Sequence, residues 1–177
     1  MNLLYVSGHR FIKCANGDLY TTGQMGEKYF YRFKGVFEHV TVIGFYENDN
    51  EGNALKKVEI VNKNIEFLDY LLVEGSNFPV LNEIFTAKKI SRLSKSLIRK
   101  YDRVATKAPS LVACKAVGEA KKNRVSCYVE LVGCPWDALW NHSLKGKLVA
   151  PLMWYKTKKA IEGAPYVLYV TNNFLQR

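Results

Sequence analysis

The chain has 177 residues, a formal net charge of +10, 48% hydrophobic residues and 24% charged residues. These values are typical of a single folded domain, and they exclude a disordered chain or one that needs disulfides or metal to fold. The excess of lysine and arginine suits nucleic acid, an anionic membrane surface or a phosphorylated ligand, and does not choose among them.

The cysteines and the apolar runs narrow the class of protein further. Cys14, Cys114, Cys127 and Cys134 form no Cys-x-x-Cys pair, so we expect free thiols, buried at Cys114 and Cys127, in a reducing cytosol. We therefore expect no metal site and no cofactor. No apolar run approaches the roughly 18 residues of a membrane span, and the first ten residues are unlike a signal peptide.

Hydrophobic periodicity predicts alternating strands and helices along the chain. Short apolar runs predict strands at 2–6, 39–45, 57–61, 65–71, 103–106, 123–133 and 165–170. Amphipathic stretches predict helices at 26–37, 79–101, 110–122 and 143–163, the last with a break or a start near Pro151. This alternation favours an α/β domain with a mostly parallel sheet and helices on both faces.

The first strand is followed by a glycine-containing loop that is a candidate binding site. His9 and Arg10 come at the carboxyl end of this strand, where open parallel sheets bind ligands. Gly23 and Gly26 precede the first helix and would let a ligand approach the backbone or the helix end. The alternative is that these glycines only make turns, because their spacing matches neither the dinucleotide fingerprint nor a phosphate-binding loop.

A second candidate site follows the strand at 123–133. Its side chains are amphipathic or titratable: Trp136, Asp137, Trp140, Asn141 and His142. Tryptophan faces stack on sugar rings, and a carboxylate can orient or deprotonate a hydroxyl. The alternative is purely structural, with Asp137 as a helix N-cap and the tryptophans packed under the sheet.

The helix at 79–101 carries a basic face opposite its apolar one. Lys88, Arg92, Lys95 and Arg99 share this face at helical spacing, with few acidic residues nearby. It is either a solvated surface or a surface that binds anionic lipid head groups.

The residues that carry a family resemblance lie in the last third of the chain. The stretches VELVGCPWDALWNHSLKGKLVAP (129–151) and APYVLYVTNNFLQR (164–177) resemble the N-terminal half of bacterial family-four glycosyltransferases of the GT-B fold. The opening LLYVSGHRF (3–11) and VFEHVTVIGF (36–45) fit the same half, so the resemblance spans essentially the whole chain.

This resemblance implies a Rossmann-like three-layer α/β/α domain over residues 1–177 that binds the acceptor. A second domain, absent from this chain, would bind a nucleotide-sugar donor, and the two would transfer a sugar with retention of configuration and without a bound metal. The acceptor would be a glycan or a lipid-linked sugar, in the cytoplasm or at the inner face of the cell membrane. Thr171 and the following asparagines are good N-caps for a further helix, so we expect the natural chain to continue; the alternative is a frayed tail.

Residue by residue, the resemblance places Gly23 and Gly26 near the cleft and Asp137 in the acidic role. Many members carry a histidine directly before that acid, whereas this chain has Pro135 and Trp136 there. The role of that histidine is vacant or falls to His142 or His9. The alternative function is a non-catalytic module that docks on a membrane or a partner chain. We expect no nucleic-acid partner, because no RRM, helix-turn-helix or OB-type pattern is present.

Overall fold

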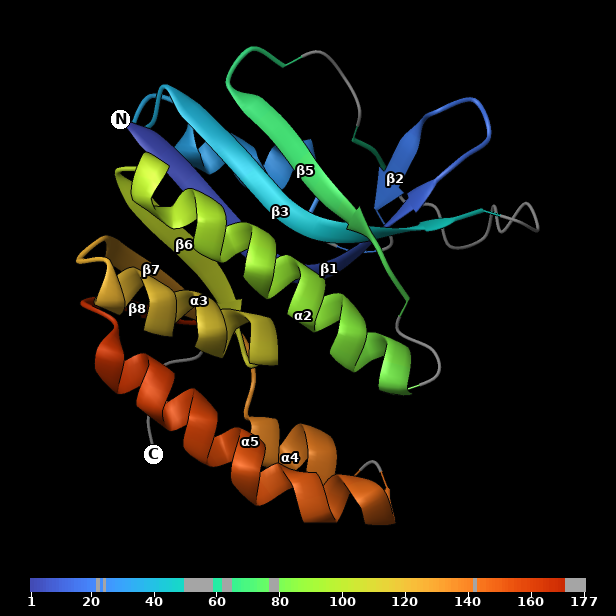
Figure 1. Ribbon diagram of the computed structural model, residues 1–177, viewed down its shortest axis with the longest axis vertical. Helices are drawn as coiled ribbons and strands as arrows, with labels where there is room; N and C mark the ends of the chain where they lie inside the picture. The colour runs from blue at the N-terminus through green and yellow to red at the C-terminus, as the bar shows by residue number, and fades with distance from the viewer. Residues whose placement is uncertain are drawn as a thin grey trace.

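The computed structural model describes residues 1–21, 23, 25–49, 59–61, 65–76, 80–141 and 143–170. In these residues eight strands form one sheet (Figure 1). The strands are β1 (Asn2–Lys13), β2 (Leu19–Thr21), β3 (His39–Asn48), β4 (Glu59–Ile60), β5 (Leu68–Glu74), β6 (Arg103–Ala108), β7 (Ser126–Leu131) and β8 (Tyr166–Tyr169). The helices are α1 (Glu27–Phe30), α2 (Val80–Leu97), α3 (Leu111–Lys122), α4 (Pro135–Trp140) and α5 (Leu144–Gly163), with 3₁₀ turns at Tyr31–Phe33 and Ile98–Lys100.

Six of the strands are parallel, and they confirm the expected Rossmann-like fold class. Their order across the sheet is β5-β3-β1-β6-β7-β8. Numbered among themselves along the chain, they follow the order 3-2-1-4-5-6 of doubly wound nucleotide-binding domains. The chain crosses from the β5 edge through α2 to β6, so the topological switch point lies between β1 and β6.

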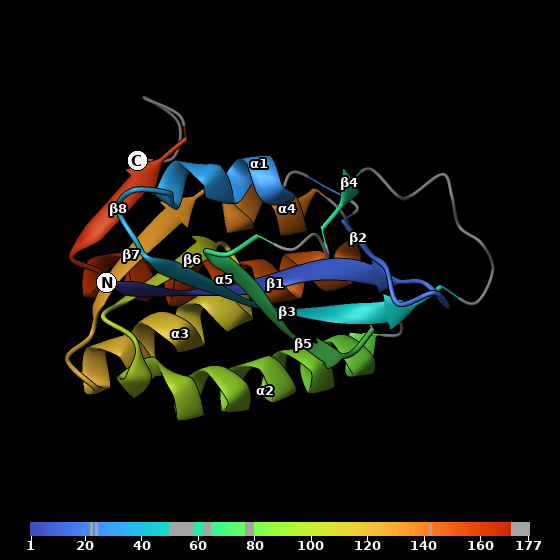
Figure 2. The same ribbon diagram turned by 90° about the horizontal axis from the view of Figure 1, so that it is seen from above.

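Two hydrophobic cores lie on opposite faces of the sheet. Leu4 and Val6 of β1 point into a core shared with α2, α3 and the end of α5, whereas Leu3 and Tyr5 point into a core closed by α1 and its 3₁₀ turn. Figure 2 shows α2 and α3 on one side of the sheet and α1 on the other. The alternation of side chains along one strand therefore builds both cores at once.

A bulge in β1 shapes the sheet at the switch point. Val6 pairs with Ile43 and Arg10 with Phe45, so that residues 7–9 stand opposite Gly44 alone. A Cβ at Gly44 would come 3.1 Å from the backbone oxygen of His9, and the bulge therefore needs glycine there. Before the bulge β1 pairs with β6, and after it β1 pairs with the antiparallel β2.

Several elements differ from the boundaries that periodicity predicts. β1 runs on to Lys13, and the short β2 pairs with it, where a loop was expected. The first helix is shorter than 26–37, because Lys34 is extended and Gly35 has a positive φ of 87°. The expected strand at 57–61 is described only at 59–61, and residues 171–177, with their expected helix start, lie outside the described residues.

Helices α4 and α5 pack closely at a glycine. α5 continues through Pro151 without the expected break, because Pro151 lies on the exposed side, where water can solvate the carbonyl that loses its helical partner. A Cβ at Gly146 would overlap the backbone oxygen of Leu139 in α4. Only glycine therefore lets the two helices approach this closely.

We predict that Gly146→Ala destabilises the fold by about 1–3 kcal/mol, because the added methyl group must push α4 away from α5. Gly118→Ala in α3 is the matched control, since a Cβ there meets no atom within 4 Å. The control should stabilise the protein by about 0.5–1 kcal/mol through helix propensity. Urea unfolding followed by circular dichroism measures both changes, and equal free energies of unfolding for the two variants would contradict the packing argument.

Candidate functional site

The candidate site lies at the switch point, beyond the carboxyl end of β6. In open parallel sheets, ligands bind in the crevice where neighbouring strands connect in opposite directions. His9 follows the part of β1 that pairs with β6, and Lys107 lies next to the carboxyl end of β6. The positive charge of Lys107 acts on the imidazole of His9 and helps to lower its pKa, so the two side chains interact electrostatically.

His9 is held by hydrogen bonds on both its backbone and its ring. Its backbone N–H donates to the Ser7 hydroxyl at 3.0 Å, and its Nε2 lies 2.6 Å from Oγ1 of Thr21 in β2. The Thr21 hydroxyl donates to the Gly23 carbonyl at 3.3 Å. When the Thr21 hydroxyl donates to Gly23, it accepts from a protonated Nε2 of His9, and Nδ1 is then an acceptor.

The imidazole of His9 is neutral at physiological pH. Burial, together with the positive charges of Lys107 and Arg10, lowers the pKa of His9 to about 4. A neutral ring with a free acceptor nitrogen suits a hydrogen bond from a ligand hydroxyl.

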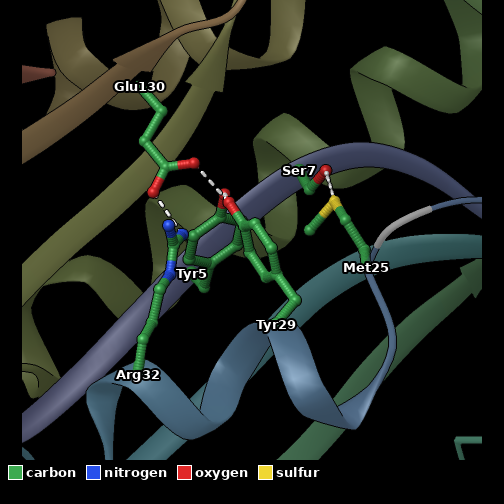
Figure 3. Close-up of polar contacts among 6 residues, drawn as sticks. All are labelled: Tyr5, Ser7, Met25, Tyr29, Arg32 and Glu130. Atoms are coloured by element: carbon green, nitrogen blue, oxygen red, sulfur yellow. Dashed lines mark hydrogen bonds and ion pairs between the residues drawn. The ribbon is translucent and has the colours of Figure 1, made fainter. Parts of the chain in front are cut away.

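A buried polar network lies under α1 (Figure 3). Glu130 of β7 is buried and accepts hydrogen bonds from the Tyr29 hydroxyl and the Arg32 guanidinium. The hydroxyls of Tyr29 and Tyr5 lie 2.6 Å apart. Burial and the hydrogen bond to Glu130 raise the pKa of Tyr29, so the phenol stays protonated.

Lys107 lies next to both this network and His9. Lys107 and Glu130 are paired in register on neighbouring strands, and Nζ of Lys107 lies 5.4 Å from the centre of the Tyr29 ring. Chemically, this edge of the sheet offers a cation, a neutral imidazole and nearby hydroxyls. Such groups bind a polyhydroxylated ligand or one that carries an anionic group.

Of the other residues expected at the first candidate site, one lies beside His9 and two do not. Gly23 lies against the ring of His9, where a Cβ would come 3.2 Å from Cε1. Gly26 is the N-cap of α1, which has only four residues. Arg10 forms an ion pair with Glu47 of β3 at 3.1 Å, and strand alternation puts it on the face opposite His9.

The second expected site forms the separate helix α4, after the carboxyl end of β7. Trp136 and Trp140 stack on each other with their ring centres 4.9 Å apart. Asp137 lies in the first turn and is not the N-cap, which is Cys134. Asn141 is the exposed C-cap, and His142 lies outside the described residues.

The basic face of α2 is exposed as expected at Lys88, Arg92, Lys95 and Arg99. Its opposite side packs into the core through Ile90, Leu93 and Leu97.

The cysteines and the acidic residues offer no second kind of chemistry in the described part of the chain. All four cysteines are free; Cys127 is buried, with a pKa raised to about 12, whereas Cys114 is only half-buried. No group of three histidine, cysteine or carboxylate side chains is placed to hold a metal ion there. Nor is any described helix long and apolar enough to cross a bilayer.

Sequence reasoning missed Lys107, Tyr29, Arg32 and Glu130. One signal was present, because Glu130 is a lone acid inside an otherwise apolar strand, and such a residue needs a buried partner. The partners themselves come from α1 and its 3₁₀ turn, about 100 residues earlier in the chain.

Comparison with known proteins gives one informative match. No known protein-family model matches the chain. It is 30% identical, over 99% of its length, to Protein CapJ of Staphylococcus aureus. The chain spans 43% of the length of that relative, so it is similar to less than half of CapJ.

We predict that His9 stays neutral down to a pH near 4 and makes stability depend on pH. Its pKa is about 4 in the folded chain against an ordinary 6.5, so the unfolded chain binds the proton more tightly. The contribution, on the order of 3 kcal/mol, is complete above pH 6.5 and is lost as the pH falls toward 4. NMR titration of the imidazole, with urea unfolding at several pH values, measures it; a His9 resonance that titrates near 6.5 would contradict it.

We also predict that Glu130→Gln destabilises the chain by about 1–3 kcal/mol, because the amide cannot serve both the Tyr29 hydroxyl and the Arg32 guanidinium as the carboxylate does. Glu38→Gln is the control, since Glu38 is 84% exposed and forms a surface ion pair with the N-terminal ammonium group. The control should change the free energy of unfolding by less than about 0.5 kcal/mol. Equal losses in both variants would argue against a buried network.

Proposed function

We propose that this chain is the acceptor-binding half of a retaining glycosyltransferase that acts in surface polysaccharide synthesis. The observation that carries the proposal is the group of side chains at the switch point, where the neutral His9 contacts the hydroxyl of Thr21 and the cationic Lys107 lies near the ring of Tyr29. A sugar acceptor presents hydroxyls, and a lipid-linked acceptor also presents phosphate. These side chains offer a complementary group for each.

The similarity to Protein CapJ, a protein more than twice as long as this chain, is compatible with this proposal. The chain aligns with 43% of that protein, which leaves room for a second domain in a relative of the same design. In our proposal residues 1–177 bind the acceptor, a glycan or a lipid-linked sugar. The further domain binds the nucleotide-sugar donor, and catalysis needs both. The proposed location is the cytoplasm, at the inner face of the cell membrane.

Each candidate residue has a role in this proposal. His9 accepts a hydrogen bond from an acceptor hydroxyl through Nδ1, and Lys107 holds an anionic group of the acceptor. Gly23 keeps the loop close to His9. The Trp136 and Trp140 pair forms an apolar wall for a sugar ring.

Asp137 has the catalytic role in the proposal. The acceptor oxygen forms the new glycosidic bond on the face of the anomeric carbon from which the nucleoside diphosphate departs, so that configuration is retained, and the acceptor hydroxyl loses its proton to the Asp137 carboxylate. Asn141, the exposed C-cap of α4, completes the acceptor side as a secondary contact.

A second candidate function is a non-catalytic module that docks on an anionic surface or a partner chain. The exposed basic face of α2 favours it. In that case the residues at the switch point would bind a ligand without catalysing sugar transfer, and no donor domain would be needed.

We predict that Asp137→Asn in the full-length protein lowers kcat by about 100-fold or more, because a positioned base is lost. Lys107→Ala should instead raise KM for a phosphorylated acceptor about tenfold. The assay follows transfer of labelled sugar from nucleotide-sugar to lipid-linked acceptors. Asp18→Asn, in an exposed turn beside Asn16, is the control and should leave both constants unchanged.

The outcomes separate the two functions. Loss of turnover with Asp137→Asn but not with Asp18→Asn supports the transferase and its base. Unchanged kinetics in Asp137→Asn would remove this residue from the site, and the absence of any transfer by the full-length wild type would favour the docking module.

A further inference from the structure

Helix α5 has its large apolar residues on the wrong side for a helix that faces water. Its inward side is made of small residues, Gly146, Ala150, Thr157 and Ala160, which are buried. Its outward side carries Leu144 and Leu148, which are 80% and 83% exposed. An ordinary surface helix buries its large apolar residues and exposes polar ones, so this inversion needs an explanation.

The exposed apolar residues form one stripe along the helix. Leu144, Leu148, Leu152 and Tyr155 recur at spacings of three and four residues and so lie on one side. All four are exposed. Over these residues the stripe, which we call the α5 ridge, runs about 16 Å along the helix axis.

Lysines flank the ridge on both sides. By helical spacing, Lys145 and Lys156 lie along one side and Lys147 and Lys158 along the other, and Lys159 continues the line of the ridge toward the end of the helix. Glu162 is the only acidic residue of α5. Aromatic rings stand beside these cations, with Lys158 Nζ 5.3 Å from the Trp154 ring centre and Lys159 Nζ 4.7 Å from that of Tyr155.

A basic groove adjoins the ridge between α3 and α5. It has a volume of about 340 Å³. Four lysines line it: Lys115, Lys121, Lys156 and Lys159. Its walls between α3 and α5 include the small residues Gly118, Ala160 and Gly163, so the lysines can converge on an anion without a large side chain between them.

We propose that α5 lies in the head-group region of a membrane that carries anionic lipids, with the α5 ridge entering the acyl boundary. Apolar side chains between two rows of lysines are the pattern of a helix that lies in a membrane interface. The lysine stems would reach past the ridge to lipid phosphates, and the groove would take one head group. A protein partner would have to match five lysines with acids, whereas an anionic bilayer presents that charge everywhere.

This inference goes beyond the proposed function and does not rest on it, since bilayer binding is measured without sugar transfer. It also differs from docking through the basic face of α2, and paired variants on the two helices separate the two surfaces.

The experiment measures sedimentation of the chain with extruded vesicles. Vesicles of equal parts phosphatidylglycerol and phosphatidylcholine should bind the wild type, and pure phosphatidylcholine should bind at least tenfold less. Leu144→Ser with Leu148→Ser should lower the partition coefficient at least tenfold, and so should Lys156→Glu with Lys159→Glu.

The matched controls lie on α2, where Ile84 and Phe85 are also exposed. Ile84→Ser with Phe85→Ser, and Lys88→Glu with Arg92→Glu, should change binding less than twofold. Trp154 is the direct reporter: in a Trp136→Phe, Trp140→Phe background it is the only tryptophan, and brominated lipids should quench it.

Three results would overturn the proposal. In the first, the wild type fails to sediment with phosphatidylglycerol vesicles. In the second, the α2 variants lose as much binding as the α5 variants. In the third, the leucine variant converts a wild-type dimer into a monomer and leaves vesicle binding unchanged, so that the ridge is an interface between two copies of the chain. None of these results bears on sugar transfer, which the Asp137→Asn assay tests separately.

Discussion

The bulge at residues 7–9 of β1 is the constraint on which the site depends. One strand must serve β6 along its first half and β2 along its second, and these two neighbours run in opposite directions. The extra residues opposite Gly44 let the strand change partner without breaking its ladder to β3. They also set His9 near the carboxyl end of β6, so a single irregularity in backbone pairing brings an imidazole to the switch point.

Helix α1 depends in turn on Glu130. A helix of four residues has no stability of its own in water, so tertiary contacts must hold it. Tyr29 and Arg32 fix this segment to the carboxylate in β7, and Phe30 packs edge-on against Tyr5 in the core beneath. The Tyr29 ring also lies near Lys107 of the candidate site, so the network that anchors the helix is next to that site. Structural and chemical roles therefore overlap at this edge of the sheet.

The fold class followed from the sequence because most of the parallel strands contain a short apolar run, while helices such as α2 bury one face through Ile90 and its neighbours. The site did not follow as readily. Strand β2 has three residues, too few for periodicity to detect, yet it supplies the hydroxyl that orients His9. The partners of Glu130 come from the other end of the chain, and no local pattern encodes a contact over that separation. His9 and Gly23 were predicted in one loop, and the structure places them in contact.

Helix α5 shows why periodicity alone misjudges a helix with two apolar sides. The sequence predicts a helix there, but hydrophobicity does not say which side packs inward, because glycine and alanine on one side compete with leucine on the other. Close packing decides the matter: a Cβ at Gly146 would overlap the α4 backbone, so a larger residue there would prevent the contact. Small residues therefore face the protein, and leucines are left to the outside. The protein gains close helix contacts at the cost of an uncovered apolar ridge, a cost that a membrane surface would remove.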